Sequence, residues 1–168
     1  MEVKGAVLLY TLAGLMVTFA GFSALLLGIR QAAGAHLSPL DRFLAKTVLI
    51  QLFTLMAGAL LPPLLALYGL SETWIWRGSA LLFGLPMLAL LLSYPRCRRK
   101  VIGKGPPPVV MAVFVLFGAA AIAAMLVYVL VGLQYGAAAY ISALVINFFT
   151  LAFAFITALD VIMQQPAD

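Results

Sequence analysis

The sequence predicts an all-α integral membrane protein: a compact bundle of five transmembrane helices that takes up the whole chain, 1–168, as a single domain. Hydrophobic residues make up 65% of the 168 residues and charged residues only 9%, and the mean hydropathy is +1.17. A soluble domain cannot bury so much apolar surface. Short segments with charges, prolines or glycines separate apolar runs long enough to cross the hydrocarbon core, which takes about 20 residues. The five runs lie at about 5–29, 43–70, 76–94, 109–133 and 140–163.

The first run ends at Arg30 and could be confused with a secretory signal. A signal peptide has a basic start and an apolar core of about 7–15 residues. This run is longer than such a core, and only Glu2 and Lys4 precede it as charged residues. We therefore interpret it as a spanning helix.

Start signals precede the later helices. In HLSPLDRF, Ser38 can cap the second helix, with Pro39 at the first helical position and Asp41 near the free N–H groups. Ser71 and Glu72 offer similar chemistry to the third helix, and three consecutive prolines precede the fourth. Helix capping explains these acidic residues without a functional site.

Polar and small residues follow one face of the fifth helix and one face of the second, at about 100° per residue. The first helix has a similar face of glycines and threonines. One interpretation is close helix packing, because small and hydroxyl-bearing residues let membrane helices approach each other. The alternative is a polar cavity, which would be lined by Gln51, Thr54, Pro62, Asn147, Thr150 and Thr157.

Asp160 lies about one helical turn inside the predicted end of the fifth span. A carboxylate at this depth needs a partner, and Arg30 and Arg42 belong to the same end of the bundle. One interpretation is an interhelical ion pair between Asp160 and either arginine. The other is a proton or cation site, because carboxylates inside membranes often serve relays in transporters.

Asn147 has no charged neighbour in the outer half of the bundle. Pro62 and Pro63 lack backbone N–H groups and therefore leave carbonyls of the second helix without their helical donors. We expect Asn147 to hydrogen-bond to these carbonyls and, with Pro62, to border a groove that opens to the outer leaflet.

Basic residues concentrate on one side of the predicted membrane. Of the ten Lys and Arg residues, only Lys4 and Arg77 fall on the opposite side. The positive-inside rule then predicts an N-terminus outside and a cytoplasmic C-terminus. The loop PRCRRKVIGKGPPP should also attract anionic lipid, at about 1 kcal/mol per charge near the surface. The residues expected to do so are Arg96, Arg98, Arg99, Lys100 and Lys104.

Patterns typical of catalytic and metal sites are missing. His36 is the only histidine and Cys97 the only cysteine, and neither an HExxH nor a GxSxG motif occurs. We expect no enzymatic activity, no metal and no cofactor. The basic charge predicts contact with membrane lipids and not with nucleic acid.

These features favour a small accessory or assembly protein, or a lipid-contacting one, that acts through helix packing. Membrane lipids are the expected partners, and another membrane protein or a second copy of the chain are further candidates. The alternative is a small transporter or channel that uses the polar faces of helices one, two and five. The charge bias and short loops indicate the inner (plasma) membrane of a bacterium.

Overall fold

The computed structural model describes residues 5–32, 38–132 and 135–163, except for the side chains at 27, 30 and 158–163. Nearly all of this part of the chain is helical, and it contains no strand. The helices are α1 (Ala6–Ala32), α2 (Pro39–Leu67), α3 (Glu72–Ile102), α4 (Pro108–Val113), η1 (Phe114–Ala119), α5 (Ala120–Val131) and α6 (Gly136–Met163). The π-helical stretch η1 joins α4 to α5 without a break, and we call the three together the fourth span. Within the described residues, five helices are long and apolar enough to cross a membrane, as predicted.

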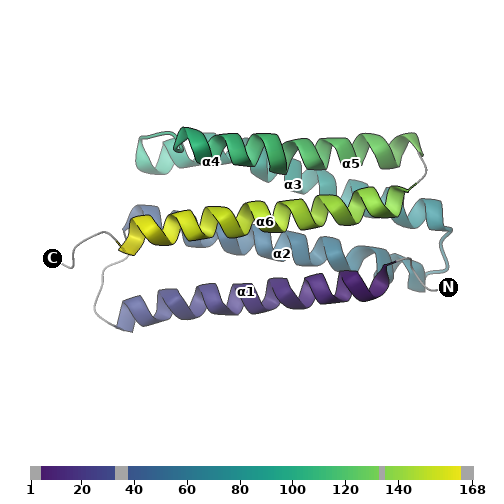
Figure 1. Ribbon diagram of the computed structural model, residues 1–168, viewed down its shortest axis with the longest axis horizontal. Coiled ribbons are helices and arrows are strands. Elements are labelled where there is room, and N and C mark those ends of the chain that lie inside the picture. Colours follow the sequence, from purple (N-terminus) through teal and green to yellow (C-terminus); the bar gives the residue numbers. More distant parts are fainter. Residues whose placement is uncertain (1–4, 33–37, 133–134, 164–168) are drawn as a thin grey trace.

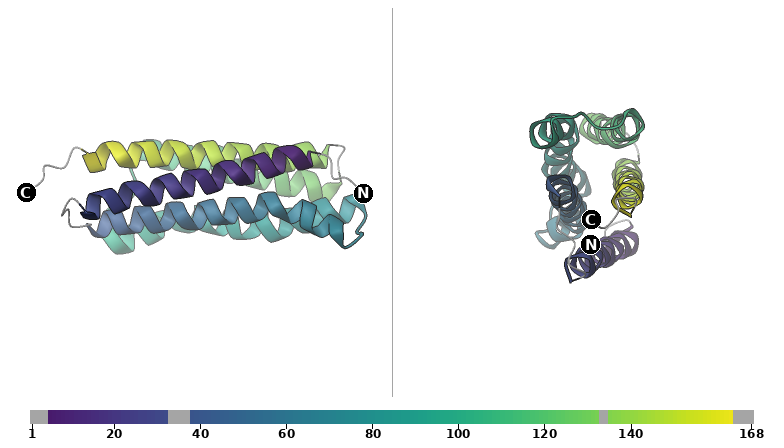
Figure 2. Two further views of the ribbon diagram at one scale, coloured as in Figure 1. Left: turned by 90° about the horizontal axis from the view of Figure 1, so that it is seen from below. Right: turned by 90° about the vertical axis from the view of Figure 1, so that its left-hand side faces the viewer.

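Successive spans run antiparallel along one common axis (Figure 1). α2, α3, the fourth span and α6 form a ring in which each packs against the next, and α6 closes the ring against α2. α1 lies outside this ring, packed chiefly along α2 (Figure 2). Only 28% of its apolar span is buried, against 39–44% for the other spans. α1 therefore contributes least to the interior.

The start of α2 shows the predicted cap. Ser38 Oγ accepts a hydrogen bond from Asp41 N at 3.2 Å, and Asp41 Oδ2 accepts one from Ser38 N at 3.0 Å. This reciprocal pair is a capping box, which satisfies backbone N–H groups that have no partner within the helix. Ser71 occupies the corresponding position before α3, but its side chain makes no capping hydrogen bond, contrary to the prediction.

α3 continues well beyond its predicted end at residue 94. Pro95 does not stop the helix, which runs to Ile102 and ends at Gly103 in the left-handed conformation, with φ of 74°. Arg and Lys are good helix formers, and Gly103 is the first residue after Pro95 that favours a helix end. The basic segment 96–100 therefore lies on a helix, and its prediction as a loop is wrong.

Glycines permit close contact between neighbouring helices of the ring. A Cβ on Gly58 of α2 would lie 2.5 Å from Phe83 Cδ2 of α3. A Cβ on Gly84 of α3 would lie 2.8 Å from Leu126 Cδ2 of the fourth span. A Cβ at either position would require the neighbouring side chain to move, so both glycines favour the close spacing that packing between membrane helices uses.

Candidate functional site

A hydroxyl from α6 satisfies the carbonyl that Pro62 leaves without a donor. Because Pro62 has no N–H, Gly58 O, four residues earlier, lacks its helical hydrogen bond. Tyr140 Oη donates to Gly58 O at 2.7 Å, and the Tyr140 ring is fully buried beside Trp76 and Phe83. Tyr140, and not Asn147 as predicted, serves the proline-containing part of α2.

Asn147 contacts the fourth span instead. Its Nδ2 donates to Ala143 O of α6 at 2.8 Å and to Gly118 O of η1 at 3.4 Å. Gly118 permits this approach, since a Cβ there would lie 3.3 Å from Asn147 Oδ1. Asn147 is 1% exposed, and its Oδ1 has no hydrogen-bond partner in the described part of the chain. The residue is a buried link between two helices, away from the predicted groove at Pro62.

The threonines of the predicted polar faces donate to their own helices. Thr54, Thr150 and Thr157 each reach the carbonyl four residues earlier, at 2.8, 2.8 and 2.9 Å. Thr54 lines an outer groove beside Phe83, whereas Thr150 is buried. Gln51 and Thr157 do come together, because both line a cavity of about 70 Å³ inside the helix ring. The structure therefore brings Gln51 and Thr157 together and places Thr54 and Thr150 elsewhere.

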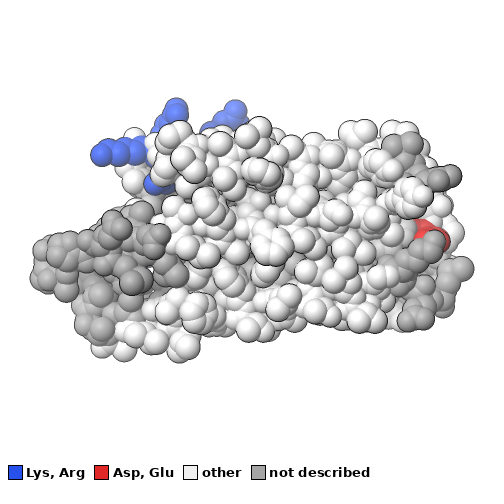
Figure 3. Space-filling view, in the orientation of Figure 1, with Lys and Arg blue, Asp and Glu red and all other residues white. Residues whose placement is uncertain are grey.

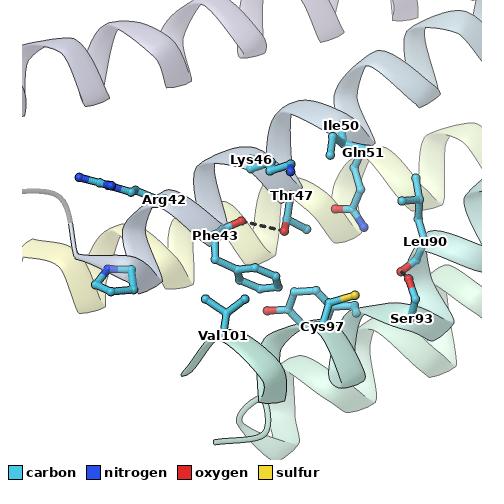
Figure 4. A pocket seen from close by; sticks show the side chains of 12 residues that line it. Arg42, Phe43, Lys46, Thr47, Ile50, Gln51, Leu90, Ser93, Cys97 and Val101 are labelled. Atoms are coloured by element: carbon cyan, nitrogen blue, oxygen red, sulfur yellow. Dashed lines mark hydrogen bonds between the residues drawn. The ribbon is translucent and has the colours of Figure 1, made fainter. Parts of the chain in front are cut away.

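A larger pocket of about 700 Å³ opens between α2 and α3, and we call it the α2–α3 pocket (Figure 4). From α3 it is lined by Leu90, Ser93, Tyr94, Cys97 and Val101. From α2, beyond Pro39 at the helix start, it is lined by Arg42, Phe43, Lys46, Thr47, Ile50 and Gln51. Ile50 and Cys97 are exposed, so the pocket opens on the outer surface of the bundle.

The α2–α3 pocket lies at the end of the bundle with most of the described basic side chains, which we call the basic end. Exposed Arg42 and Lys46 border the pocket from α2. The last turns of α3 and the connection after it add the predicted lipid contacts Arg96, Arg98, Arg99, Lys100 and Lys104. Figure 3 shows Lys and Arg gathered at this end and a patch of acidic side chain at the other. An apolar space thus adjoins a positively charged surface.

Gln51 is a buried polar side chain of the α2–α3 pocket. It is 2% exposed, and its Oε1 has no hydrogen-bond partner among the described residues. The 70 Å³ cavity is also lined by Gln51, Thr47 and Tyr94, so these three side chains separate the α2–α3 pocket from that cavity. The Tyr94 ring stacks on Phe114 with ring centroids 5.0 Å apart and lies 5.8 Å from Phe43. These contacts make Tyr94 a fixed wall of the pocket.

The predicted pairing of Asp160 stays a prediction. The side chains of Asp160 and Arg30 fall outside the described residues, whereas Arg42 is described and lines the α2–α3 pocket. Within the described residues, no group of three His, Cys, Asp or Glu side chains could hold a metal ion.

Sequence reasoning identified Arg42 and Gln51 but missed most of the α2–α3 pocket. On α2, the spacing of Arg42 and Lys46 by four residues, with Phe43 between them, was an available signal, because it places two charges beside an aromatic ring. On α3, Cys97 and Val101 could be found only by recognising that the helix continues past residue 94.

Comparisons with protein-family models, curated proteins and solved structures gave no match to this chain. The chemistry of the pocket itself is therefore the basis for a functional proposal.

Proposed function

We propose that this chain is a non-enzymatic lipid-binding protein of a bacterial plasma membrane that holds an anionic lipid at its basic end. In this proposal the N-terminus lies outside and the C-terminus in the cytoplasm. The sidedness of charge supports this orientation. Apart from Arg77, the described Lys and Arg side chains lie where α2 begins, where α3 ends and in the connection that follows α3.

One observation carries the proposal: the α2–α3 pocket combines apolar walls with a basic rim. Phe43, Ile50 and Leu90 offer the dispersion contacts that an acyl chain can fill. Arg42 and Lys46 provide positive charge for a phosphate, worth about 1 kcal/mol per charge near a membrane surface. The volume of about 700 Å³ is within the range of small-molecule sites.

Lipid binding fits an accessory role better than transport. A lipid in the α2–α3 pocket would contact both helices and so stabilise their packing. The transporter alternative gains less support, because Thr54, Thr150 and Thr157 already donate to their own backbones and do not line one continuous space.

The test measures lipid binding to the purified full-length protein in detergent micelles by native mass spectrometry. Phosphatidylglycerol should bind as a resolved one-to-one adduct and be favoured over phosphatidylcholine. Arg42→Gln combined with Lys46→Gln should weaken phosphatidylglycerol binding by up to about 30-fold, as expected for two charges worth about 1 kcal/mol each.

Arg99→Gln combined with Lys104→Gln is the matched control, because it removes equal charge at the same end but outside the α2–α3 pocket. Both residues are expected to attract an anionic bilayer surface, which a detergent micelle does not present, so this control should weaken one-to-one binding by less than about three-fold, through long-range attraction alone. The proposal fails if the two double variants behave alike, or if phosphatidylcholine binds as tightly as phosphatidylglycerol.

A further inference from the structure

Gln51 is a buried amide without a hydrogen bond in the described part of the chain. The residue is 2% exposed, no donor reaches its Oε1, and its Nε2 makes no hydrogen bond to a described residue. Buried polar groups are normally paired, and an unpaired one costs free energy. Helix packing alone would favour an apolar side chain of this size, so a glutamine here indicates a role that packing does not require.

The amide of Gln51 borders the α2–α3 pocket. Figure 4 shows the side chain reaching from α2 toward α3, with its amide nitrogen on the side of Leu90 and Ser93 and its oxygen on the side of Thr47. Two neighbouring hydroxyls already donate elsewhere: Thr47 Oγ1 to Phe43 O at 2.8 Å, and Ser93 Oγ to Leu90 O at 3.1 Å. A ligand acceptor in this part of the pocket would therefore find a free donor at Gln51.

Gln51 also lies deeper in the bundle than the basic rim. Five residues separate it from Lys46, about 7.5 Å along the helix axis at about 1.5 Å per residue. In a glycerophospholipid the acyl ester carbonyls likewise lie deeper in the membrane than the phosphate, on the other side of the glycerol unit. The oxygen of an ester carbonyl accepts hydrogen bonds, so it can pair with an N–H group that borders the pocket.

We propose that the α2–α3 pocket selects anionic glycerophospholipids with ester-linked chains. The phosphate lies at Arg42 and Lys46, and an ester carbonyl accepts a hydrogen bond from Gln51 Nε2. This inference rests on the proposed lipid binding and adds Gln51 as its specificity-determining residue. An ether-linked lipid with the same headgroup and tails has no carbonyl at this depth and loses the hydrogen bond.

The test compares ester-linked phosphatidylglycerol with its ether-linked analogue on the full-length protein in micelles. Cys97 lines the pocket and is exposed, so each lipid should slow its alkylation by a maleimide when bound. We expect the ester lipid to bind about five-fold more tightly, the ratio for one neutral hydrogen bond. Gln51→Leu should bring this ratio to about one by weakening only the ester lipid.

Two further variants keep the test decisive. Gln51→Met removes the amide at similar volume and replaces the leucine variant if that one does not fold. Thr54→Val, on the same helix but outside the α2–α3 pocket, should keep the wild-type ratio. In lipid-free micelles Gln51→Leu should melt at or above the wild-type temperature, because the amide has no partner to lose. A lower melting temperature would indicate a structural role and overturn the inference.

The outcomes separate this inference from the proposed function. If wild-type protein prefers phosphatidylglycerol over phosphatidylcholine but binds the ester and ether forms equally, the role of Gln51 is refuted and anionic lipid binding stands. Equal weakening of both forms by Gln51→Leu also refutes that role. If phosphatidylglycerol protects Cys97 no better than phosphatidylcholine, only annular lipid is present, and the proposed function fails with the inference.

Discussion

Replacing Tyr140 with phenylalanine removes one hydroxyl and keeps the ring that packs on Trp76 and Phe83. The Tyr140 Oη to Gly58 O distance of 2.7 Å is that of a well-formed O–H···O bond, and both residues are buried. An acceptor left unpaired in a protein interior costs about 1–3 kcal/mol, whereas hydrogen bonds between membrane helices average about 0.6 kcal/mol. We expect Tyr140→Phe to lower the free energy of unfolding by about 1–2 kcal/mol.

The assay follows SDS-induced unfolding in mixed micelles through tryptophan fluorescence, to which Trp76 beside Tyr140 contributes. Pro62→Ala restores the N–H that can bond to Gly58 O, so Tyr140→Phe should cost less than about 0.5 kcal/mol in that background. Tyr10→Phe, on an exposed ring of α1, is the control and should be neutral. Equal costs in the two backgrounds would refute the explanation that Tyr140 compensates for the proline.

Three other predictions follow from the packing and the proposed orientation. Gly58→Ala should destabilise the bundle by about 1–3 kcal/mol, since its Cβ would meet Phe83 at 2.5 Å, whereas Gly14→Ala has no atom within 4 Å and should be neutral or stabilising in the same unfolding assay. Asn147→Asp should greatly reduce folded yield, measured by size-exclusion chromatography, because it buries a carboxylate, whereas Asn147→Ala should cost only about 1 kcal/mol. A membrane-impermeant maleimide should label Cys97 in inverted vesicles and not in intact cells; the reverse result would overturn the proposed orientation.

The number of spans was predictable because bilayer thickness sets the length of an apolar run. The start of α2 was also predictable, since Ser38 and Asp41 form their capping box within four residues of chain. The end of α3 was not. Hydropathy marks where hydrocarbon contact ends, whereas the helix itself continues through residues 96–100 to Gly103.

Contacts between helices could not be derived from a single helix face. Tyr140 and Asn147 both belong to α6, and either could in principle serve a carbonyl freed by Pro62. Which one does so depends on the rotation and height of α6 against α2, and in the structure these place Tyr140 at Gly58 O. The α2–α3 pocket likewise forms only where two helices meet. From the sequence, only residues of its α2 side could be singled out.

The polar residues that the sequence singled out differ in how far their side-chain hydrogen bonds are satisfied. A threonine hydroxyl can donate to the carbonyl four residues earlier on its own helix, as Thr54, Thr150 and Thr157 do, and so needs no external partner. A carboxamide has more donors and acceptors than its own helix satisfies here. Asn147 uses its amide between α6 and η1, whereas the amide of Gln51 borders an open pocket. Among the five polar side chains predicted to line a cavity, only Gln51 makes no hydrogen bond to a described residue, and ligand selectivity is therefore expected from it.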